Sequence, residues 1–279
     1  VQTWMYHSDF IGGLLAKFAG TKKILWGLRN SLLDSRKINF STRIIIYINS
    51  ILSKYIPYKI VSCSKIAINQ HINIGYDKKK FIFIPNGFSN LLEKNKNLSI
   101  NLYNQYNINQ NYIVFSNFSR WDMQKDHQTL LYAFSIFKKN YKKKWVLFLA
   151  GNKIDNNNNE LTELINKYDL NNNIILLGKI PNIHEYFSIV NLNISSSQYG
   201  EGFPNVIAEG MIYGVPCIGT NIGDTKYIIK NSGWLINPRD PKGLYNAIKN
   251  ASDEFETNKF IKKSSISKQI INEEFSLNK

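Results

Sequence analysis

Two glutamates with a proline between them have a spacing that suits a phosphorylated ligand. Glu201 lies in a short loop with a glycine on either side, and seven residues separate it from Glu209. Pro204 favours the start of a helix, and the first backbone N–H groups of that helix, near Asn205 and Val206, would form an anion site. Glu209 would lie ~8 Å along the helix at about 1.5 Å per residue, so the carboxylates can bind hydroxyl groups on either side of one phosphate.

The surrounding pattern is that of a βαβ unit. An apolar run, Leu192–Ile194, precedes the loop, and a second apolar run, Val215–Ile218, follows the predicted helix. Ligands of parallel sheets bind beyond the carboxyl ends of the strands, which is where the loop Gln198–Phe203 is expected. Gly202 lets a ligand approach this backbone closely, and Gly214 predicts the end of the helix.

A second loop of this kind carries two cations. Arg120 and Lys125 follow the predicted buried strand Tyr112–Ser116, and a helix with an apolar face is predicted after them. An arginine can donate to two phosphate oxygens at once, whereas a lysine supplies a mobile point charge. Both loops are therefore expected at the carboxyl ends of strands, where a diphosphate would find opposite charge.

The N-terminal third of the chain offers two further polar candidates. His7 is expected in a loop, Met5–Ser8, at the carboxyl end of a strand, although a single histidine is more often structural. Arg29 follows the predicted strand Lys23–Leu28 and would meet an anionic acceptor, the donor phosphates or an ordinary salt-bridge partner. Apolar spacing predicts a core helix over Ile38–Tyr55, with Ile44, Ile45, Ile48, Ile51 and Leu52 toward the core.

The composition restricts the class of protein. The chain has 279 residues, 43% of them hydrophobic, and a formal net charge of +15, which favours anionic partners. Its lysines are scattered among Asn and Ile, so nucleic acid is not an expected partner, whereas an anionic membrane surface remains one. Cys63 and Cys217 lie far apart, which fits a reducing cytoplasm. We find no apolar run of about 18 residues and therefore predict no transmembrane helix.

Three strings carry a resemblance to a known family. EGFPNVIAEGMIYGVPCIGTNIGD, FSRWDMQKDHQTLL and WMYHSDFIGGLLAKFAG resemble the retaining GT-B glycosyltransferases of glycosyltransferase family 4, also called glycosyl transferases group 1. The resemblance implies that Glu201 contacts the transferred sugar and that Glu209 holds the ribose hydroxyls. It implies that Arg120 and Lys125 neutralise the donor diphosphate and that His7 orients the sugar. Of these five residues, four are the expected catalytic ones: His7, Glu201, Arg120 and Lys125.

The same resemblance implies the remaining contacts to the donor. Lys179 lies in the loop that lines the nucleobase through backbone contacts in this family. The other expected donor-binding residues lie at the loop and helix already described: Gly202, Phe203, Pro204, Asn205, Val206 and Glu209. No metal and no cofactor are expected, because cationic side chains replace the divalent ion and the nucleotide-sugar is a substrate. Ser89 stands where the family usually has an Asp after the Asn-Gly turn.

The expected fold class is α/β with GT-B architecture, in which two Rossmann-like domains face each other across a cleft. Residues 1–95 are expected to be the C-terminal part of the N-terminal, acceptor-side domain, and 96–111 a linker. Residues 112–279 are expected to be the donor-binding domain. The first domain is expected to be incomplete and the chain truncated at both ends, since it begins at Val1 without Met.

The expected function is retaining, metal-independent sugar transfer. The donor is a nucleotide-diphosphate sugar and the acceptor a glycan or lipid-linked glycan in surface polysaccharide biosynthesis. The expected location is cytoplasmic and peripheral on the inner face of the cytoplasmic membrane. The alternatives are a nucleotide-sugar-binding module without turnover, a nucleic-acid-binding protein and a sugar phosphorylase of the same fold.

Overall fold

The chain folds into two compact α/β units. The computed structural model describes residues 1–31, 38–89 and 96–277. The first unit comprises Val1–Asn86 and Gly200–Pro204, and the second comprises Gly87–Tyr199 and Asn205–Lys279. Each unit is built on a parallel sheet, which confirms the predicted α/β class. The domain limit predicted at residue 95 lies outside the described residues.

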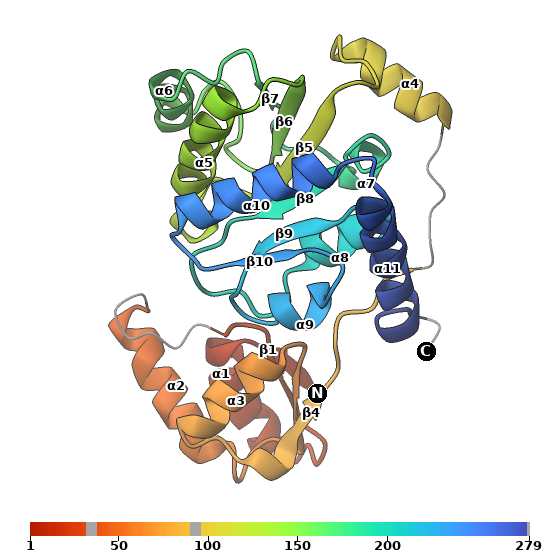
Figure 1. The fold of residues 1–279 in the computed structure, drawn as a ribbon. Helices are drawn as coiled ribbons and strands as arrows, with labels where there is room; N and C mark the ends of the chain where they lie inside the picture. The colour runs from red at the N-terminus through yellow and green to blue at the C-terminus, as the bar shows by residue number, and fades with distance from the viewer. Residues whose placement is uncertain (32–37, 90–95, 278–279) are drawn as a thin grey trace. The chain divides into compact units, whose positions relative to one another are not determined.

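The first unit has a four-stranded parallel sheet in the order β1-β2-β3-β4 (Figure 1). Its strands are β1 (Gln2–Trp4), β2 (Leu25–Leu28), β3 (Lys59–Ser62) and β4 (Phe81–Phe83). The connections are α1 (Tyr6–Phe18), α2 (Phe40–Leu52), α3 (Lys65–Asn73) and the short η2 (Lys78–Lys80). Parallel neighbours need such crossovers, and the core forms where the helices cover the sheet around Ile24, Trp26 and Ile60, each 0% exposed.

Two predictions for this unit are wrong in detail. His7 lies in the first turn of α1 rather than in a loop, because Met5 adopts a φ of 70° and its carbonyl accepts a hydrogen bond from the Asp9 N–H at 2.9 Å. In α2, Ile44 and Ile51 are exposed, whereas Asn49 is fully buried and its amide donates to the Tyr6 carbonyl at 2.8 Å. The α2 sequence is apolar around most of its circumference, so its periodicity could not identify the packed face.

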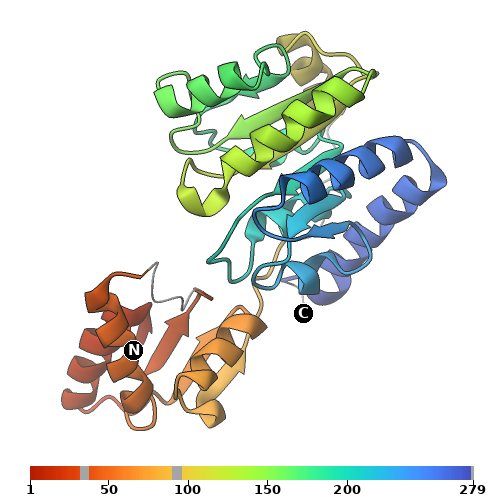
Figure 2. The same cartoon turned by 60° about the vertical axis from the view of Figure 1, so that its left-hand side comes forward.

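The second unit has a six-stranded parallel sheet in the order β10-β9-β8-β5-β6-β7. Its strands are β5 (Ile113–Phe118), β6 (Trp145–Ala150), β7 (Ile174–Leu176), β8 (Leu192–Ser195), β9 (Cys217–Thr220) and β10 (Trp234–Ile236). Its helices are α4 (Lys96–Gln105), η3 (Met123–Lys125), α5 (His127–Asn140), α6 (Asn159–Lys167), α7 (Ile183–Tyr186), α8 (Asn205–Ile212), α9 (Thr225–Ile229), α10 (Pro241–Glu254) and α11 (Asn258–Glu274). Figures 1 and 2 show α5 and α10 packed side by side.

The strand order reverses at one place in this sheet. The chain runs outward from β5 to β6 and β7, then returns to β8 on the opposite side of β5 and continues to β9 and β10. In open parallel sheets this reversal marks the crevice in which ligands bind, because the loops on its two sides leave in opposite directions. The loops after β5 and β8 are the two that flank it.

The strand–loop–helix–strand unit predicted around β8 is present, with shifted limits. α8 begins at Asn205, so Pro204 precedes the helix rather than occupying its first position. Gly214 has a φ of 69° just past the helix, as its predicted role requires. β9 begins at Cys217, two residues later than the apolar run suggests. No helix in the described part of the chain combines the length and apolarity needed to cross a membrane.

The segment predicted as a linker contains regular structure. Residues 96–105 form α4, and β5 follows at Ile113. At the other end of the second unit, the Phe88 N–H donates to the Phe275 carbonyl at 2.7 Å, and the Leu277 N–H donates to the Phe88 carbonyl at 2.9 Å. These bonds attach the C-terminal segment to the first residues of the same unit.

Candidate functional site

Side-chain and main-chain hydrogen bonds join the two loops at the reversal point of the second sheet. The Ser196 hydroxyl, just after β8, donates to the Lys125 carbonyl at 2.8 Å. The Gln198 N–H donates to the Gln124 carbonyl at 2.8 Å, and the Gln198 side-chain amide donates to the Met123 carbonyl. The loop that carries the predicted cations is therefore fixed against the segment that leads to α8.

Arg120 is held at the surface of this loop by neighbours in the sequence. Its guanidinium forms an ion pair with Asp122 at 3.3 Å and donates to the Gln124 side-chain oxygen at 3.0 Å. The Arg120 side chain is 52% exposed, and an exposed ion pair of this kind contributes about 0–1 kcal/mol. A phosphate can therefore replace Asp122 as the partner of Arg120 at little cost.

The first turn of α8 is positioned by a buried amide. Asn193 on β8 is 0% exposed, its amide donates to the Val206 carbonyl at 2.8 Å, and its side-chain oxygen accepts from the Ser116 hydroxyl at 3.0 Å. Asn205, the first residue of the helix, is exposed. The N-terminus of α8 thus has a fixed place at the end of β8, where its backbone N–H groups can receive an anion.

Glu209 is a half-buried carboxylate in the second turn of α8. Within the described residues its side chain has no hydrogen-bond or ion-pair partner. Burial raises the pKa of Glu209 above its ordinary value, with no neighbouring donor to offset it. A carboxylate left in this state is stabilised by any ligand that supplies hydroxyl donors.

Lys179 lies in the loop after β7, and two strands, β5 and β6, separate β7 from β8 in the sheet. Gly178 before it has a φ of 65°, and its carbonyl accepts from the Gly151 N–H at 2.8 Å, so the loops after β6 and β7 are joined. Lys179 itself is exposed. It shares the carboxyl edge of the sheet with the residues above.

The other predicted site residues belong to the first unit. His7 is exposed in the first turn of α1. The segment Gly200–Pro204, with Glu201, groups with this unit, where the Ser31 hydroxyl donates to the Glu201 carbonyl. A Cβ on Gly202 would lie 2.2 Å from the Arg29 carbonyl oxygen. Glycine is thus required at this position by the chain's own backbone.

The site residues predicted from the sequence are therefore divided between the two units. The second unit carries Arg120, Lys125, Lys179, Asn205, Val206 and Glu209, and the first carries His7, Glu201, Gly202, Phe203 and Pro204. Three polar residues were missed: Asn193, Ser196 and Asp122. The signal for Asn193 was available, since an amide inside an apolar strand needs buried partners.

No group of three or more His, Cys, Asp or Glu side chains that could hold a metal ion occurs among residues 1–31, 38–89 and 96–277. Cys63 and Cys217 are buried, and neither takes part in a disulfide.

Comparison with known proteins gives the family. Residues 100–267 match the family described as glycosyl transferases group 1, and this segment covers more than half of the 279-residue chain. The chain belongs to this family. It is also similar to the uncharacterized glycosyltransferase MJ1059 of Methanocaldococcus jannaschii, with 32% identity over 205 residues. That alignment covers 72% of this chain and 48% of the relative, so the chain spans about half the length of that protein.

Solved structures give the same assignment for the fold. The glycosyltransferase of Rickettsia africae matches with a TM-score of 0.83 at 25% identity, over 100% of this chain and 73% of that one. HepE of Anabaena, solved with UDP, matches with a TM-score of 0.85 at 20% identity, over 99% of this chain and 74% of that one. The fold is that of the GT-B glycosyltransferases, as predicted.

Proposed function

We propose that this group 1 family member transfers a sugar from a nucleotide-diphosphate donor to an acceptor hydroxyl. The observation that carries the proposal is Glu209, a half-buried carboxylate without a partner among the described residues, on the helix that follows the reversal point of the sheet. Two cations, Arg120 and Lys125, lie in the loop on the other side of that point. The structural relative HepE, solved with UDP and with UDP-glucose, supports a uridine nucleotide as the first ligand to test.

The proposed chemistry is electrostatic. When the bond between the anomeric carbon and the β-phosphate oxygen breaks, negative charge develops on the leaving diphosphate. Arg120, Lys125 and the N–H groups of α8 at Asn205 and Val206 stabilise that charge, and preorganised donors of this kind are the largest single contribution in many enzymes. Glu209 accepts hydrogen bonds from the ribose hydroxyls.

The remaining assignments rest on the family resemblance of the sequence. Glu201 contacts the transferred sugar, and His7 orients it. Gly202, Phe203 and Pro204 line the donor, and the Lys179 loop lines the nucleobase through its backbone. Replacement of His7 by Ala should therefore lower turnover while leaving the affinity for UDP unchanged.

The finer proposal is a retaining enzyme of glycosyltransferase family 4 that uses neither a metal nor a cofactor. Its acceptor is a glycan or a lipid-linked glycan in surface polysaccharide biosynthesis, and its site of action is the inner face of the cytoplasmic membrane. The net charge of +15 supports contact with an anionic membrane surface. The reaction class and acceptor are supported by the resemblance of the sequence motifs.

A nucleotide-sugar-binding module without turnover is the second candidate. It is favoured by one observation: Arg120, Lys125 and Glu209 all belong to the second unit. Donor binding and sugar transfer must therefore be measured separately.

Calorimetric titration with UDP tests donor binding directly. Glu209→Ala should weaken UDP binding by tenfold or more, because a hydrogen bond to a charged group contributes about 1.5–3 kcal/mol. The matched control is Glu273→Ala, which removes an exposed carboxylate from α11 and should leave the affinity unchanged. Equal affinity for UDP in the wild type and Glu209→Ala, or no binding to the wild type, would overturn the assignment.

A further inference from the structure

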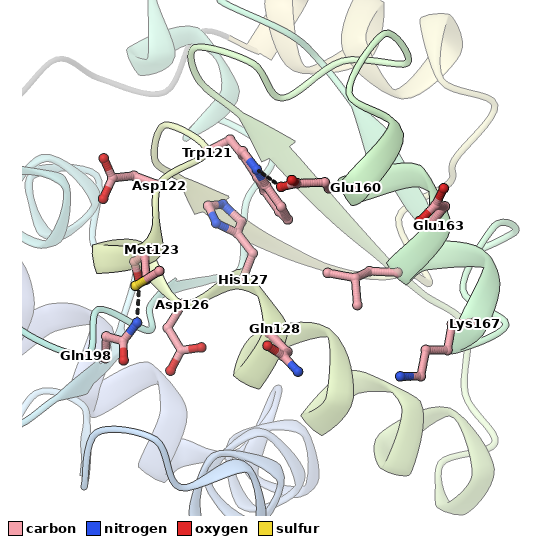
Figure 3. A pocket seen from close by; sticks show the side chains of 11 residues that line it. Trp121, Asp122, Met123, Asp126, His127, Gln128, Glu160, Glu163, Lys167 and Gln198 are labelled. Atoms are coloured by element: carbon pink, nitrogen blue, oxygen red, sulfur yellow. Dashed lines mark hydrogen bonds between the residues drawn. The ribbon is translucent and has the colours of Figure 1, made fainter.

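A pocket of about 520 Å³ lies between the loop after β5 and the helices α5 and α6. Figure 3 shows Trp121 and His127 on one side of it, Gln128 below, and Glu163 and Lys167 on α6 at the other side. Volumes of about 300–1,000 Å³ are usual for sites that bind small organic ligands. None of the residues proposed to bind the donor lines this pocket.

Two further hollows share lining residues with this pocket. A second hollow shares Trp121 and Glu160 with it and extends along the amide-rich segment Asn157–Asn159. A third shares Gln128 and Gln198 with it and extends to Tyr132 and Tyr168, whose ring centroids lie 5.6 Å apart. The three hollows share lining residues on the second unit and are hereafter called the outer groove; an aromatic side chain lines each of them.

The hydrogen bonds around His127 determine which of its ring nitrogens carries the proton. The Ser119 hydroxyl donates its only proton to the Asn117 side-chain oxygen at 2.7 Å, because the Asn117 amide is directed to the Ile194 carbonyl at 3.0 Å. The contact of 3.2 Å between Ser119 Oγ and His127 Nε2 therefore needs the proton on Nε2. His127 Nδ1 is then a bare acceptor.

That acceptor has no partner. His127 is 2% exposed, and its Nδ1 makes no hydrogen bond with any described residue. Burial lowers the pKa of His127 to about 4, so the ring stays neutral and cannot donate from Nδ1 at neutral pH. A buried acceptor left without a partner costs about 1–3 kcal/mol. His127 lines the pocket, and a shift of this wall that let a ligand hydroxyl or a bridging water reach Nδ1 would remove that cost.

The other groups of the outer groove select a ligand rich in hydroxyl groups. Glu160 accepts from the Trp121 indole N–H at 3.2 Å and retains a second carboxylate oxygen for a ligand. Glu163 is exposed and has no partner among the described residues. Gln128 supplies an amide, which can both donate to and accept from a hydroxyl group.

In the central pocket, charge disfavours an anionic ligand. The central pocket has four carboxylates, Asp122, Asp126, Glu160 and Glu163, and one lysine, Lys167, in a chain whose net charge is +15. A nucleotide or a lipid phosphate would meet like charge there. A neutral sugar ring meets no like charge. Its hydroxyl groups bind carboxylates and amides, and its apolar face packs on an aromatic ring.

We propose that the outer groove binds a neutral oligosaccharide, a segment of the glycan that the enzyme extends. The identity of the glycan as acceptor or product rests on the proposed sugar transfer, but the binding itself does not. None of the residues proposed to bind the donor lines the groove, so it holds a part of the glycan other than the reacting end. Binding at such a site raises the local concentration of the glycan without contributing to the chemical step.

The experiment is a titration of the whole 279-residue chain without nucleotide, followed by the indole N–H resonances in NMR spectra. The probes are maltohexaose, cellohexaose and chitohexaose, and the cationic comparator is spermidine. The Trp121 resonance is assigned with Trp121→Phe, which keeps a ring. At least one oligosaccharide should shift this resonance with saturation, and in calorimetry Trp121→Ala and Glu160→Gln should weaken its binding about tenfold or more.

The control is Tyr58→Ala, which removes a 55%-exposed aromatic ring from the first unit and should not change oligosaccharide affinity. The absence of saturable shifts with all three oligosaccharides up to about 10 mM, a limit near −3 kcal/mol of binding free energy, would overturn the proposal. Saturation by spermidine alone would overturn it as well, in favour of a cationic ligand. Because no nucleotide is present, failure of UDP binding would leave these results interpretable.

Discussion

The side-chain amide of Asn193 donates to the main-chain carbonyl of Val206 at 2.8 Å. The same side chain accepts from Ser116, so one buried residue connects β5, β8 and the first turn of α8. The place of the α8 N-terminus is therefore set by the sheet rather than by the loop that precedes it. The proposed anion site depends on this connection.

Asn193→Ala should destabilise the second unit and weaken UDP binding together. It leaves the buried Ser116 hydroxyl without its acceptor and removes the bond to Val206, at a cost of about 1–3 kcal/mol. Thermal unfolding and UDP calorimetry measure the two effects. The control is Asn140→Ala, at the exposed end of α5, which removes a single amide bond to Ile136. A wild-type melting temperature in Asn193→Ala would contradict the structural role.

Glu209→Gln should make the protein more stable and the donor site weaker. Burial raises the pKa of Glu209, so the folded state binds its proton more tightly than the unfolded state, and folding is opposed as the pH rises above the unfolded pKa. A neutral amide removes that opposition. Melting temperature at pH 7 and UDP affinity should change in opposite directions. A loss of stability in Glu209→Gln would show that the carboxylate has a partner that stabilises it.

If Arg120 binds the donor phosphate as proposed, Asp122 should compete with that phosphate for the guanidinium. Asp122→Asn keeps the oxygen that accepts from the Gln124 N–H at 2.8 Å but removes the charge that holds the guanidinium. UDP binding should strengthen by up to about fivefold, which corresponds to an exposed pair of at most about 1 kcal/mol. Arg120→Ala should lower turnover by roughly 10²–10³-fold. Weaker UDP binding in Asp122→Asn would contradict this competition, because it would mean that Asp122 and Arg120 both contact UDP.

His127 should remain neutral throughout the physiological range. Burial lowers the pKa of His127 to about 4, with a further lowering from the Lys125 charge that Asp122 partly opposes. Between about pH 4 and pH 6.5, the unfolded chain therefore binds more protons at this histidine than the folded chain does. The stability contributed by His127 is complete above about pH 6.5 and is lost as the pH falls through about 4.

Two measurements check the state of His127. Its ring resonances should not titrate above pH 5, whereas those of an unperturbed histidine would have a midpoint near 6.5. In acid, the melting temperature of the second unit should decrease less steeply in His127→Gln than in the wild type. A ring that titrates near its ordinary pKa would contradict both the burial and the tautomer assigned from Ser119.

Short-range patterns predicted the parts of the fold that depend on neighbouring residues. The loop and helix after β8 were found from the apolar runs and from Gly214, because the end of a helix requires a local conformation that glycine adopts readily. The Ser64 side chain, just before α3, accepts from the Ala67 N–H at 3.0 Å, a contact that likewise involves only neighbouring residues. The family and its GT-B fold followed from the longer motifs, which also named the candidate site residues.

Long-range contacts account for what the sequence left open. Nothing local shows that β8 returns to the side of β5, although this pairing joins the Lys125 loop to Ser196. The packed side of α2 is set by the buried amide of Asn49, which the apolar spacing did not include. The outer groove has no motif, because its aromatic and polar residues come from separate elements. The roles of the candidate site residues stay predictions.

The central claim is sugar transfer that depends on Arg120 and Glu209. The most direct measurement is the rate of UDP release from UDP-glucose, UDP-galactose and UDP-N-acetylglucosamine, with a lipid-linked glycan fraction as acceptor. The account predicts that at least one donor releases UDP only when the acceptor is present. The rate of release should fall roughly 10²–10³-fold in Arg120→Ala. In Glu209→Ala the rate should be restored only by raising the donor concentration. Saturable UDP binding without release from any donor, or equal release by the wild type and Arg120→Ala, would contradict it.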